Sequence, residues 1–150
     1  DAHSSAEALR LRGKAAIAQA KIAYAMFVKS FGSSQWQALA QSGAQVQRPL
    51  WASTSTKNPD YPDTMYVDHL IGPHSVNTLP DTTMEAFRDH GSIAETITHD
   101  VDEAHRTLSA LASLGINMSE VADKLEREGV ASFAQSFNDV LQVLEDKRSR

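Results

Sequence analysis

Cysteine is absent from the sequence. A chain without cysteine has neither a disulfide framework nor a zinc site with thiolate ligands, and it fits a reducing compartment, so we expect the cytoplasm. Long apolar runs are also missing, because none approaches the roughly 18 residues that a membrane span needs. Residues 1–5 lack the charged-then-apolar pattern of a signal peptide. We therefore expect no membrane partner.

A basic excess is lacking as well. The 150 residues carry 14 Lys and Arg against 19 Asp and Glu, which gives a net charge of −5. Nucleic-acid binders need a basic surface to meet phosphates, so no nucleic-acid partner is expected. A small phosphorylated substrate remains compatible, since one local cation can bind it inside an acidic protein. Hydrophobic residues make up 41%, which is ordinary for a single globular domain with a core.

Residues 1–46 are predicted to be helical. Ser4 and Glu7 have capping-box spacing at the start of an alanine-rich run. Apolar residues then recur at steps of three and four, which is typical of one helical face: Leu11, Ala15, Ala18, Ile22 and Met26. Gly32 is expected to end this helix, and a short helical piece should follow around residues 36–40.

Residues 47–91 are predicted to form a βαβα unit. Short apolar strands are expected at 49–52 and 75–79, with a polar loop after the first and a helix over 63–71 between them. A second helix should begin with the capping-box pair Thr82 and Glu85 and end at Gly91. Two strands separated by a helix are typical of a parallel βαβ unit, which indicates an α/β fold.

Residues 92–150 are predicted to be closing helices. Thr98 is expected to cap the first helix and Gly115 to end it. Asn117 should begin a second helix, with Val121 and Leu125 facing inward, and Gly129 should stop it. A final amphipathic helix should follow, with apolar positions at Phe133, Phe137, Val140, Leu141 and Leu144. No linker interrupts the chain, so residues 1–150 are expected to form a single segment.

The polar loop after the first strand holds the candidate site. Active sites of α/β barrels gather at the carboxyl ends of their strands. The Ser and Thr hydroxyls of residues 53–56, together with Lys57, could form an anion site, although a plain solvated turn is the alternative reading. Asp60 and Asp63 should keep the Lys57 ammonium charged, which favours phosphate binding over a Schiff base. The remaining lysines are expected to face solvent: Lys14, Lys21, Lys29, Lys124 and Lys147.

Other polar residues are weaker candidates. His99, Asp102 and His105 recur at steps of three, whereas a metal-binding helix prefers a four-residue step between its histidines. We expect a solvated acidic face there and no metal site. Trp36 and Trp51 are predicted to be core residues, and Arg48 is predicted to be a structural ion-pair partner.

Several segments resemble the long bacterial transaldolases. They are QRPLWASTSTKNP at 47–59, DTMYV at 63–67, LIGP at 70–73 and VNTLP at 76–80. RGKAAIAQAK at 12–21, TMEAFRDHG at 83–91 and EREGVASF at 126–133 belong to the same pattern. The resemblance extends from about residue 9 to residue 144, and the 48–59 string is its most specific part.

The resemblance implies the C-terminal part of a (β/α)8 TIM barrel. Strands seven and eight would be present with their flanking helices, and the chain would end in a helical cluster. Transaldolases transfer a dihydroxyacetone unit from sedoheptulose 7-phosphate to glyceraldehyde 3-phosphate in the pentose phosphate pathway, which yields erythrose 4-phosphate and fructose 6-phosphate. They use a Schiff-base lysine and need no metal or organic cofactor.

The resemblance also assigns site residues. The Schiff-base lysine lies in a Lys-Ile-Pro-Ala-Thr-like strand, and nothing similar occurs in this sequence. We therefore expect no catalytic residue in the chain, no activity from the chain alone, and the remainder of the barrel as a partner. Ser55 and Lys57 match a Ser-x-Arg-Asn pattern that holds the substrate phosphate, with Lys in place of Arg. Lys binds phosphate as a point charge, without the fork of Arg.

Two alternatives stay open. The chain could come from a bifunctional transaldolase/glucose-6-phosphate isomerase, or it could be a non-catalytic helical interaction module. The lack of an initiator Met is consistent with a chain that begins inside a larger protein. The length of the native gene product would separate these hypotheses.

Overall fold

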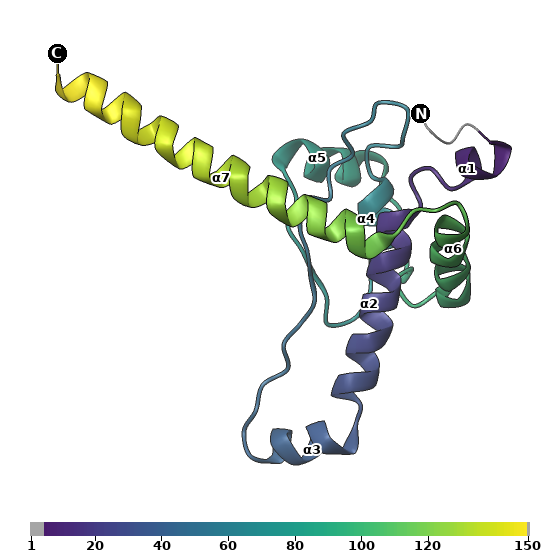
Figure 1. The fold of residues 1–150 in the computed structure, drawn as a ribbon. Helices are drawn as coiled ribbons and strands as arrows, with labels where there is room; N and C mark the ends of the chain where they lie inside the picture. Colours follow the sequence, from purple (N-terminus) through teal and green to yellow (C-terminus); the bar gives the residue numbers. More distant parts are fainter. Residues whose placement is uncertain (1–4, 150) are drawn as a thin grey trace. The chain divides into compact units, whose positions relative to one another are not determined.

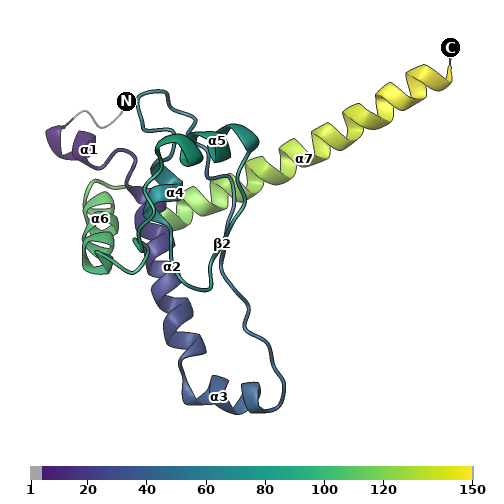
Figure 2. The same ribbon diagram turned by 180° about the vertical axis from the view of Figure 1, so that it is seen from behind.

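The computed structural model describes residues 5–149. The chain divides into two compact units, Asp1–Ala110 and Leu111–Arg150. In chain order the elements are α1 (Ala6–Arg10), α2 (Ala15–Phe31), α3 (Ser34–Gln41), β1 (Leu50–Trp51), α4 (Met65–His69), β2 (Val76–Asn77), α5 (Asp81–His90), α6 (Val101–Ser113) and α7 (Met118–Arg148) (Figure 1; Figure 2).

The first unit contains the predicted parallel pair of strands. β1 and β2 are parallel neighbours, with Leu50 opposite Val76 and Trp51 opposite Asn77. The connection between them contains α4, so the βαβ prediction is confirmed. Each strand spans two residues, whereas the sequence predicts four and five. The Val76 N–H donates to the Pro49 oxygen and the Thr78 N–H donates to the Trp51 oxygen, so the ladder is confined to these neighbouring residues. The described part of the chain is therefore mostly helical.

A turn divides the helix that is predicted for the N-terminal region. α1 ends at Arg10 and α2 begins at Ala15, and Gly13 between them has a φ of 75°. This left-handed conformation favours glycine and interrupts a right-handed helix. The cap of α1 is Ser5, whose side chain accepts a hydrogen bond from the Ala8 N–H. The predicted cap, Ser4, lies outside the described residues.

The buried face of α2 differs from the predicted one. Ala18 is buried as expected, but Met26 is 64% exposed, and the other buried positions are Lys21 and Tyr24. The prediction that Lys21 faces solvent is wrong, since this residue is only 7% exposed. Its Nζ donates to the backbone oxygen of His99 at 2.9 Å. A lysine can bury its methylene stem when its ammonium reaches an acceptor.

The core of the first unit consists of Tyr24, Leu70 and Ile97. The Tyr24 hydroxyl donates to the Pro73 oxygen at 2.8 Å, and burial, followed by the nearby Glu95 carboxylate, raises the pKa of Tyr24. A Cβ added at Gly72 would lie 2.1 Å from Cγ2 of Ile97. The backbone at residue 72 therefore lies directly against the buried isoleucine, and glycine is required for this approach.

The starts of α5 and α6 differ from the predictions. α5 begins at Asp81 with Pro80 at its N-cap, so the Thr82 capping box is wrong, whereas the predicted end at Gly91 is confirmed. α6 begins at Val101, and Thr98 donates instead to the Glu95 carboxylate at 2.9 Å. Ser, Thr and Glu side chains bond locally in several ways, so spacing alone does not fix a helix start.

The second unit is dominated by α7, a helix of 31 residues. Asn117 caps it as predicted by accepting a hydrogen bond from the Ser119 N–H at 3.0 Å. Gly129 does not stop it, because one glycine inside a helix costs only about 1 kcal/mol. The positions predicted to face inward are exposed, with Val121 at 37% and Leu125 at 64%, and Phe133 of the predicted amphipathic helix is 81% exposed. None of the described helices is both long and apolar enough to cross a membrane.

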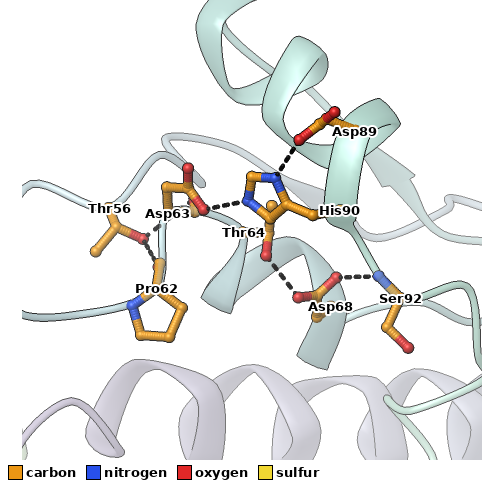
Figure 3. Close-up of polar contacts among 8 residues, drawn as sticks. All are labelled: Thr56, Pro62, Asp63, Thr64, Asp68, Asp89, His90 and Ser92. Carbon is orange, nitrogen blue, oxygen red and sulfur yellow. Dashed lines mark hydrogen bonds and ion pairs between the residues drawn. The ribbon is translucent and has the colours of Figure 1, made fainter.

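Polar contacts hold the loop between β1 and α4 (Figure 3). The Thr56 hydroxyl donates to the Pro62 oxygen at 2.9 Å. At the end of the loop, Oδ1 of Asp63 lies 2.8 Å from Nε2 of His90, which is the last residue of α5. The other ring nitrogen of His90 lies 3.1 Å from the Asp89 carboxylate. These contacts close the loop on itself and tie its end to α5.

Asp68 connects α4 to the chain after α5. Its Oδ2 accepts from the Thr64 hydroxyl at 2.7 Å, and its Oδ1 accepts from the Ser92 N–H at 2.9 Å (Figure 3). The backbone oxygen of Asp68 also accepts from the Thr96 hydroxyl at 2.6 Å. One residue therefore ties the start of α4 to the segment that leads to Ile97.

Truncation of the core isoleucine tests this arrangement. Ile97→Ala should lower the free energy of unfolding by about 2–5 kcal/mol, because Ile97 is 0% exposed and its loss leaves a cavity. The matched control is Ile93→Ala, since Ile93 is 88% exposed and such a change should stay within about 0.5 kcal/mol. Urea unfolding of both variants measures this. Equal losses would contradict the described core.

The Asp63–His90 contact predicts a pH dependence. Hydrogen bonds with Asp63 and Asp89 raise the pKa of His90 above 6.5. The contribution of His90 to the stability of the fold is therefore complete below pH 6.5, and it is lost as the pH rises through the raised pKa. The hydrogen bond with His90 lowers the pKa of Asp63 below 3.8, so its contribution is present above 3.8 and is lost in stronger acid. The pair should stabilise most between these two values.

Melting temperatures at two pH values check this sign. His90→Gln should lower Tm more at pH ~5.5 than at pH ~8.5, because protonated His90, which pairs with the Asp63 carboxylate, is lost as the pH rises. His105→Gln is the control, since His105 is exposed on α6 and has no carboxylate contact within residues 5–149. The same loss at both pH values would show that the His90 ring matters for packing and not for charge.

Candidate functional site

A cavity of about 550 Å³ lies at the carboxyl end of β1. Apolar and polar residues both line it. The apolar lining, which we call the floor, consists of Ala16, Ala20, Leu50, Trp51, Ala52 and Leu70, and the polar lining, which we call the rim, consists of Ser53, Thr54, Ser55, Lys57 and Tyr66. Helix α2, strand β1, the loop after it and helix α4 all contribute. The loop in which the sequence places the candidate site therefore borders a cavity.

The two predicted phosphate ligands lie together on this rim. Nζ of Lys57 donates to Oγ of Ser55 at 2.8 Å. Lys57 is exposed and forms no ion pair among the described residues, and Ser55 is half-buried. An ammonium carries three donors, so two remain after this contact. The pair presents an uncompensated positive charge and a hydroxyl at one point.

A hydrogen bond across the strand ends positions this loop. Thr54 is 4% exposed, and its hydroxyl donates to Oδ1 of Asn77 at 2.7 Å. Ser53, the preceding residue, has a φ of 57°, a left-handed conformation that is uncommon for residues other than glycine. The chain thus turns sharply as it leaves β1. The sequence predicts Thr54 as one of the hydroxyls of the anion site, whereas its hydroxyl is buried against Asn77. It gives no prediction for Asn77, and the signal for this residue was a polar side chain within the second strand.

Trp51 forms part of the cavity floor. It is half-buried and packs against the core of the first unit, so its prediction as a core residue is correct in part. Its Nε1–H is buried and has no hydrogen-bond acceptor among the described residues. A buried donor without an acceptor costs about 1–3 kcal/mol. Trp51 is therefore a less favourable core residue than its size suggests.

The weaker candidates have ordinary structural roles. Trp36 is half-buried and stacks edge-on against Phe31 at 4.5 Å between ring centroids. Arg48 is exposed and makes no ion pair in the described part of the chain, so its predicted role is wrong. His99, Asp102 and His105 are exposed. Within residues 5–149, no group of three or more His, Asp and Glu residues is placed to hold a metal ion.

A second cavity of about 240 Å³ borders α2 and α6. Lys14, Lys21 and His69 line it together with Asp100 and Glu103. The opposite charges offset one another, so this cavity does not favour an anion as the first one does. The buried ammonium of Lys21 already has its acceptor in the His99 oxygen.

Comparison with known proteins identifies the family. The family model described as Transaldolase/Fructose-6-phosphate aldolase matches residues 1–144. A protein named Transaldolase from Parafrankia sp. (strain EAN1pec) is 49% identical over 138 residues, which cover 91% of this chain and 37% of that protein. A protein of the same name from Thermobifida fusca is 48% identical over 136 residues, which cover 90% of this chain and 37% of that protein.

A third relative agrees. The Acidothermus cellulolyticus protein named Transaldolase is 50% identical over 135 residues, which cover 89% of this chain and 36% of the relative. The chain thus spans less than two fifths of the length of these relatives. Identity near one half, over nearly all of the chain, is far above what chance resemblance gives. The chain belongs to the transaldolase/fructose-6-phosphate aldolase family.

Proposed function

We propose that the chain supplies the sugar-phosphate-binding part of a transaldolase. The family supports this function in general, and each of the relatives above is named Transaldolase. The proposed reaction transfers a dihydroxyacetone unit from sedoheptulose 7-phosphate to glyceraldehyde 3-phosphate. The proposed setting is the pentose phosphate pathway of the cytoplasm, and the proposed architecture is a (β/α)8 barrel in which β1 and β2 are strands seven and eight.

The contact between Ser55 and Lys57 carries the proposal. A sugar phosphate needs a cation and hydroxyl or N–H donors at one point, and it needs an apolar surface for the carbon chain. Lys57 and Ser55 provide the first at 2.8 Å, and the floor of the 550 Å³ cavity provides the second. We assign Ser55 and Lys57 as the ligands of the substrate phosphate.

The Schiff-base lysine is proposed to lie outside residues 1–150. A nucleophilic lysine must be deprotonated and must reach the substrate carbonyl. Lys57 is exposed and points its ammonium at a hydroxyl, and Lys21 is buried but does not line the 550 Å³ cavity. The lysines at 14, 29, 124 and 147 are exposed and do not line it either. No lysine of the described chain is thus suited to this role.

The remainder of the barrel is the proposed partner of the exposed apolar side chains. In α7, Phe133 is 81% exposed and Phe137 is 64% exposed, which is unusual for large aromatic residues without a partner. The same side chains would suit a non-catalytic helical interaction module, which is the second candidate function. The length of the native gene product separates the two, and it also tests the fusion to an isomerase domain.

The first functional prediction concerns the covalent intermediate. The 150-residue chain should form no adduct when it is incubated with fructose 6-phosphate and borohydride, because no lysine here is placed as a nucleophile. Intact mass spectrometry measures the adduct, and a complete transaldolase treated in parallel is the positive control. A trapped sugar on any lysine of this chain would show that the catalytic lysine lies within it.

The second functional prediction concerns the phosphate. Within a complete transaldolase polypeptide, Lys57→Ala should lower kcat/KM for phosphorylated donors about ten- to a hundredfold, because a charged hydrogen bond contributes ~1.5–3 kcal/mol. Unphosphorylated donors such as fructose should be affected much less. Lys57→Arg should be mild, since it keeps the charge. Steady-state kinetics with both donor types measures this.

Lys29→Ala is the matched control for Lys57→Ala. Lys29 is an exposed lysine on α2 that does not line the cavity, so its loss should leave both donor types unchanged. An equal loss for phosphorylated and unphosphorylated donors in Lys57→Ala would remove the phosphate assignment and would indicate a general role in folding or catalysis.

A further inference from the structure

We propose that Tyr66 is a third ligand of the substrate phosphate, and that its phenol donates a hydrogen bond beside Lys57 and Ser55. The inference rests on the proposed function and extends it. Tyr66 is the second residue of α4 and lines the same 550 Å³ cavity as the two other ligands. It is half-buried, so part of its side chain remains accessible.

The hydroxyl of Tyr66 has no hydrogen-bond partner in the described structure. Within residues 5–149 it makes no hydrogen bond. Two other donors that line the cavity are committed or inaccessible: the Thr54 hydroxyl donates to Asn77, and the Trp51 Nε1–H is buried. The Ser53 hydroxyl is exposed, but Ser53 is not held on a helix as Tyr66 is. A buried phenol usually has a hydrogen-bond partner. The Tyr66 phenol has none among the described residues and lies beside the cavity, so it is available to a ligand there.

The other two tyrosines of the chain provide a comparison. The Tyr24 hydroxyl donates to the Pro73 oxygen inside the core. The Tyr61 ring lies against Gly13, where its Cζ would be 3.3 Å from an added Cβ, and it does not line the cavity. Of the three tyrosines, Tyr66 alone combines a place at the cavity with a hydroxyl that makes no hydrogen bond to the described residues.

Tyr66 is also held in a fixed place. The Thr64 hydroxyl donates to the Asp68 carboxylate across the first turn of α4, and Asp68 is tied to Ser92 beyond α5 (Figure 3). The Thr56–Pro62 hydrogen bond closes the loop that brings Lys57 back towards α4. Helix and loop are therefore tied to their surroundings, and both line the cavity.

The chemistry explains what Tyr66 would add. An ammonium binds phosphate as a point charge on a flexible stem and does not fix its direction. A tyrosine side chain has only two torsion angles, so it loses little conformational entropy on binding, and its hydroxyl donates along a defined direction. Lys57 would supply the charge, and Ser55 and Tyr66 would supply directional donors for the other phosphate oxygens. The orientation of the sugar in the cavity would then depend on Tyr66.

The experiment compares Tyr66→Phe with Tyr61→Phe in a complete transaldolase polypeptide. Each change removes one phenol oxygen and keeps the ring, and melting temperatures close to that of the wild type would confirm that both variants fold. The measured quantities are kcat and KM for fructose 6-phosphate and for fructose, and the inhibition constant of inorganic phosphate. Tyr66→Phe should raise KM for fructose 6-phosphate and the inhibition constant of phosphate about tenfold. Values for fructose, and all values for Tyr61→Phe, should stay within about twofold.

The outcomes separate this inference from the proposed function. If Tyr66→Phe binds phosphate as the wild type does while Lys57→Ala does not, the Tyr66 assignment is overturned and the site remains. Equal weakening for fructose and fructose 6-phosphate also overturns it, because the hydroxyl would then act on the sugar. If Lys57→Ala likewise leaves phosphate binding unchanged, the proposed phosphate site itself fails. When Tyr66→Phe is combined with Lys57→Ala, it should weaken phosphate binding less than it does alone, because two ligands of one phosphate are coupled.

Discussion

The cavity depends on the apolar core beneath it. Leu70 belongs to the core with Tyr24 and Ile97, and it also lines the cavity floor. Ala20 and Trp51 likewise pack against the core on one side and border the cavity on the other. Since protein interiors are close-packed and resist local change, any shift in this core moves the floor on which a substrate would rest. The polar rim can act only while the floor keeps its place.

Polar contacts hold the loop between β1 and α4 against the strands and α5, so the position of the loop also depends on the core. Trp51 ends β1, Ser53 turns the chain, and Thr54 is fixed by Asn77 on the neighbouring strand. The far end of the loop is held through Asp63, whose partner is His90 at the end of α5. Ser55 and Lys57 lie between these two anchors. The backbone at these two residues is therefore restricted in its movement, because the segment that carries them is short and is held at both ends.

Structural features that depend on neighbouring residues were predicted correctly from the sequence more often than features that depend on contacts between distant residues. The parallel strand pair, the break at Gly32 and the Asn117 cap depend on a few neighbouring residues, and each is confirmed. The errors have a different origin. Lys21 is buried because an acceptor 78 positions away reaches it, and Gly129 stays helical because its flanks are good helix formers. The pairing of Ser55 with Lys57 was within reach of the sequence, whereas the cavity beside them requires α2 and α4.

The close approach at residue 72 has an evolutionary consequence. A methyl group there would overlap the Ile97 side chain, with 2.1 Å between the two carbons. Neither residue can therefore change in size alone without strain or a void. Family members that carry alanine in place of Gly72 should carry a smaller side chain in place of Ile97. The two columns of a family alignment should therefore covary, although they lie 25 positions apart in the sequence.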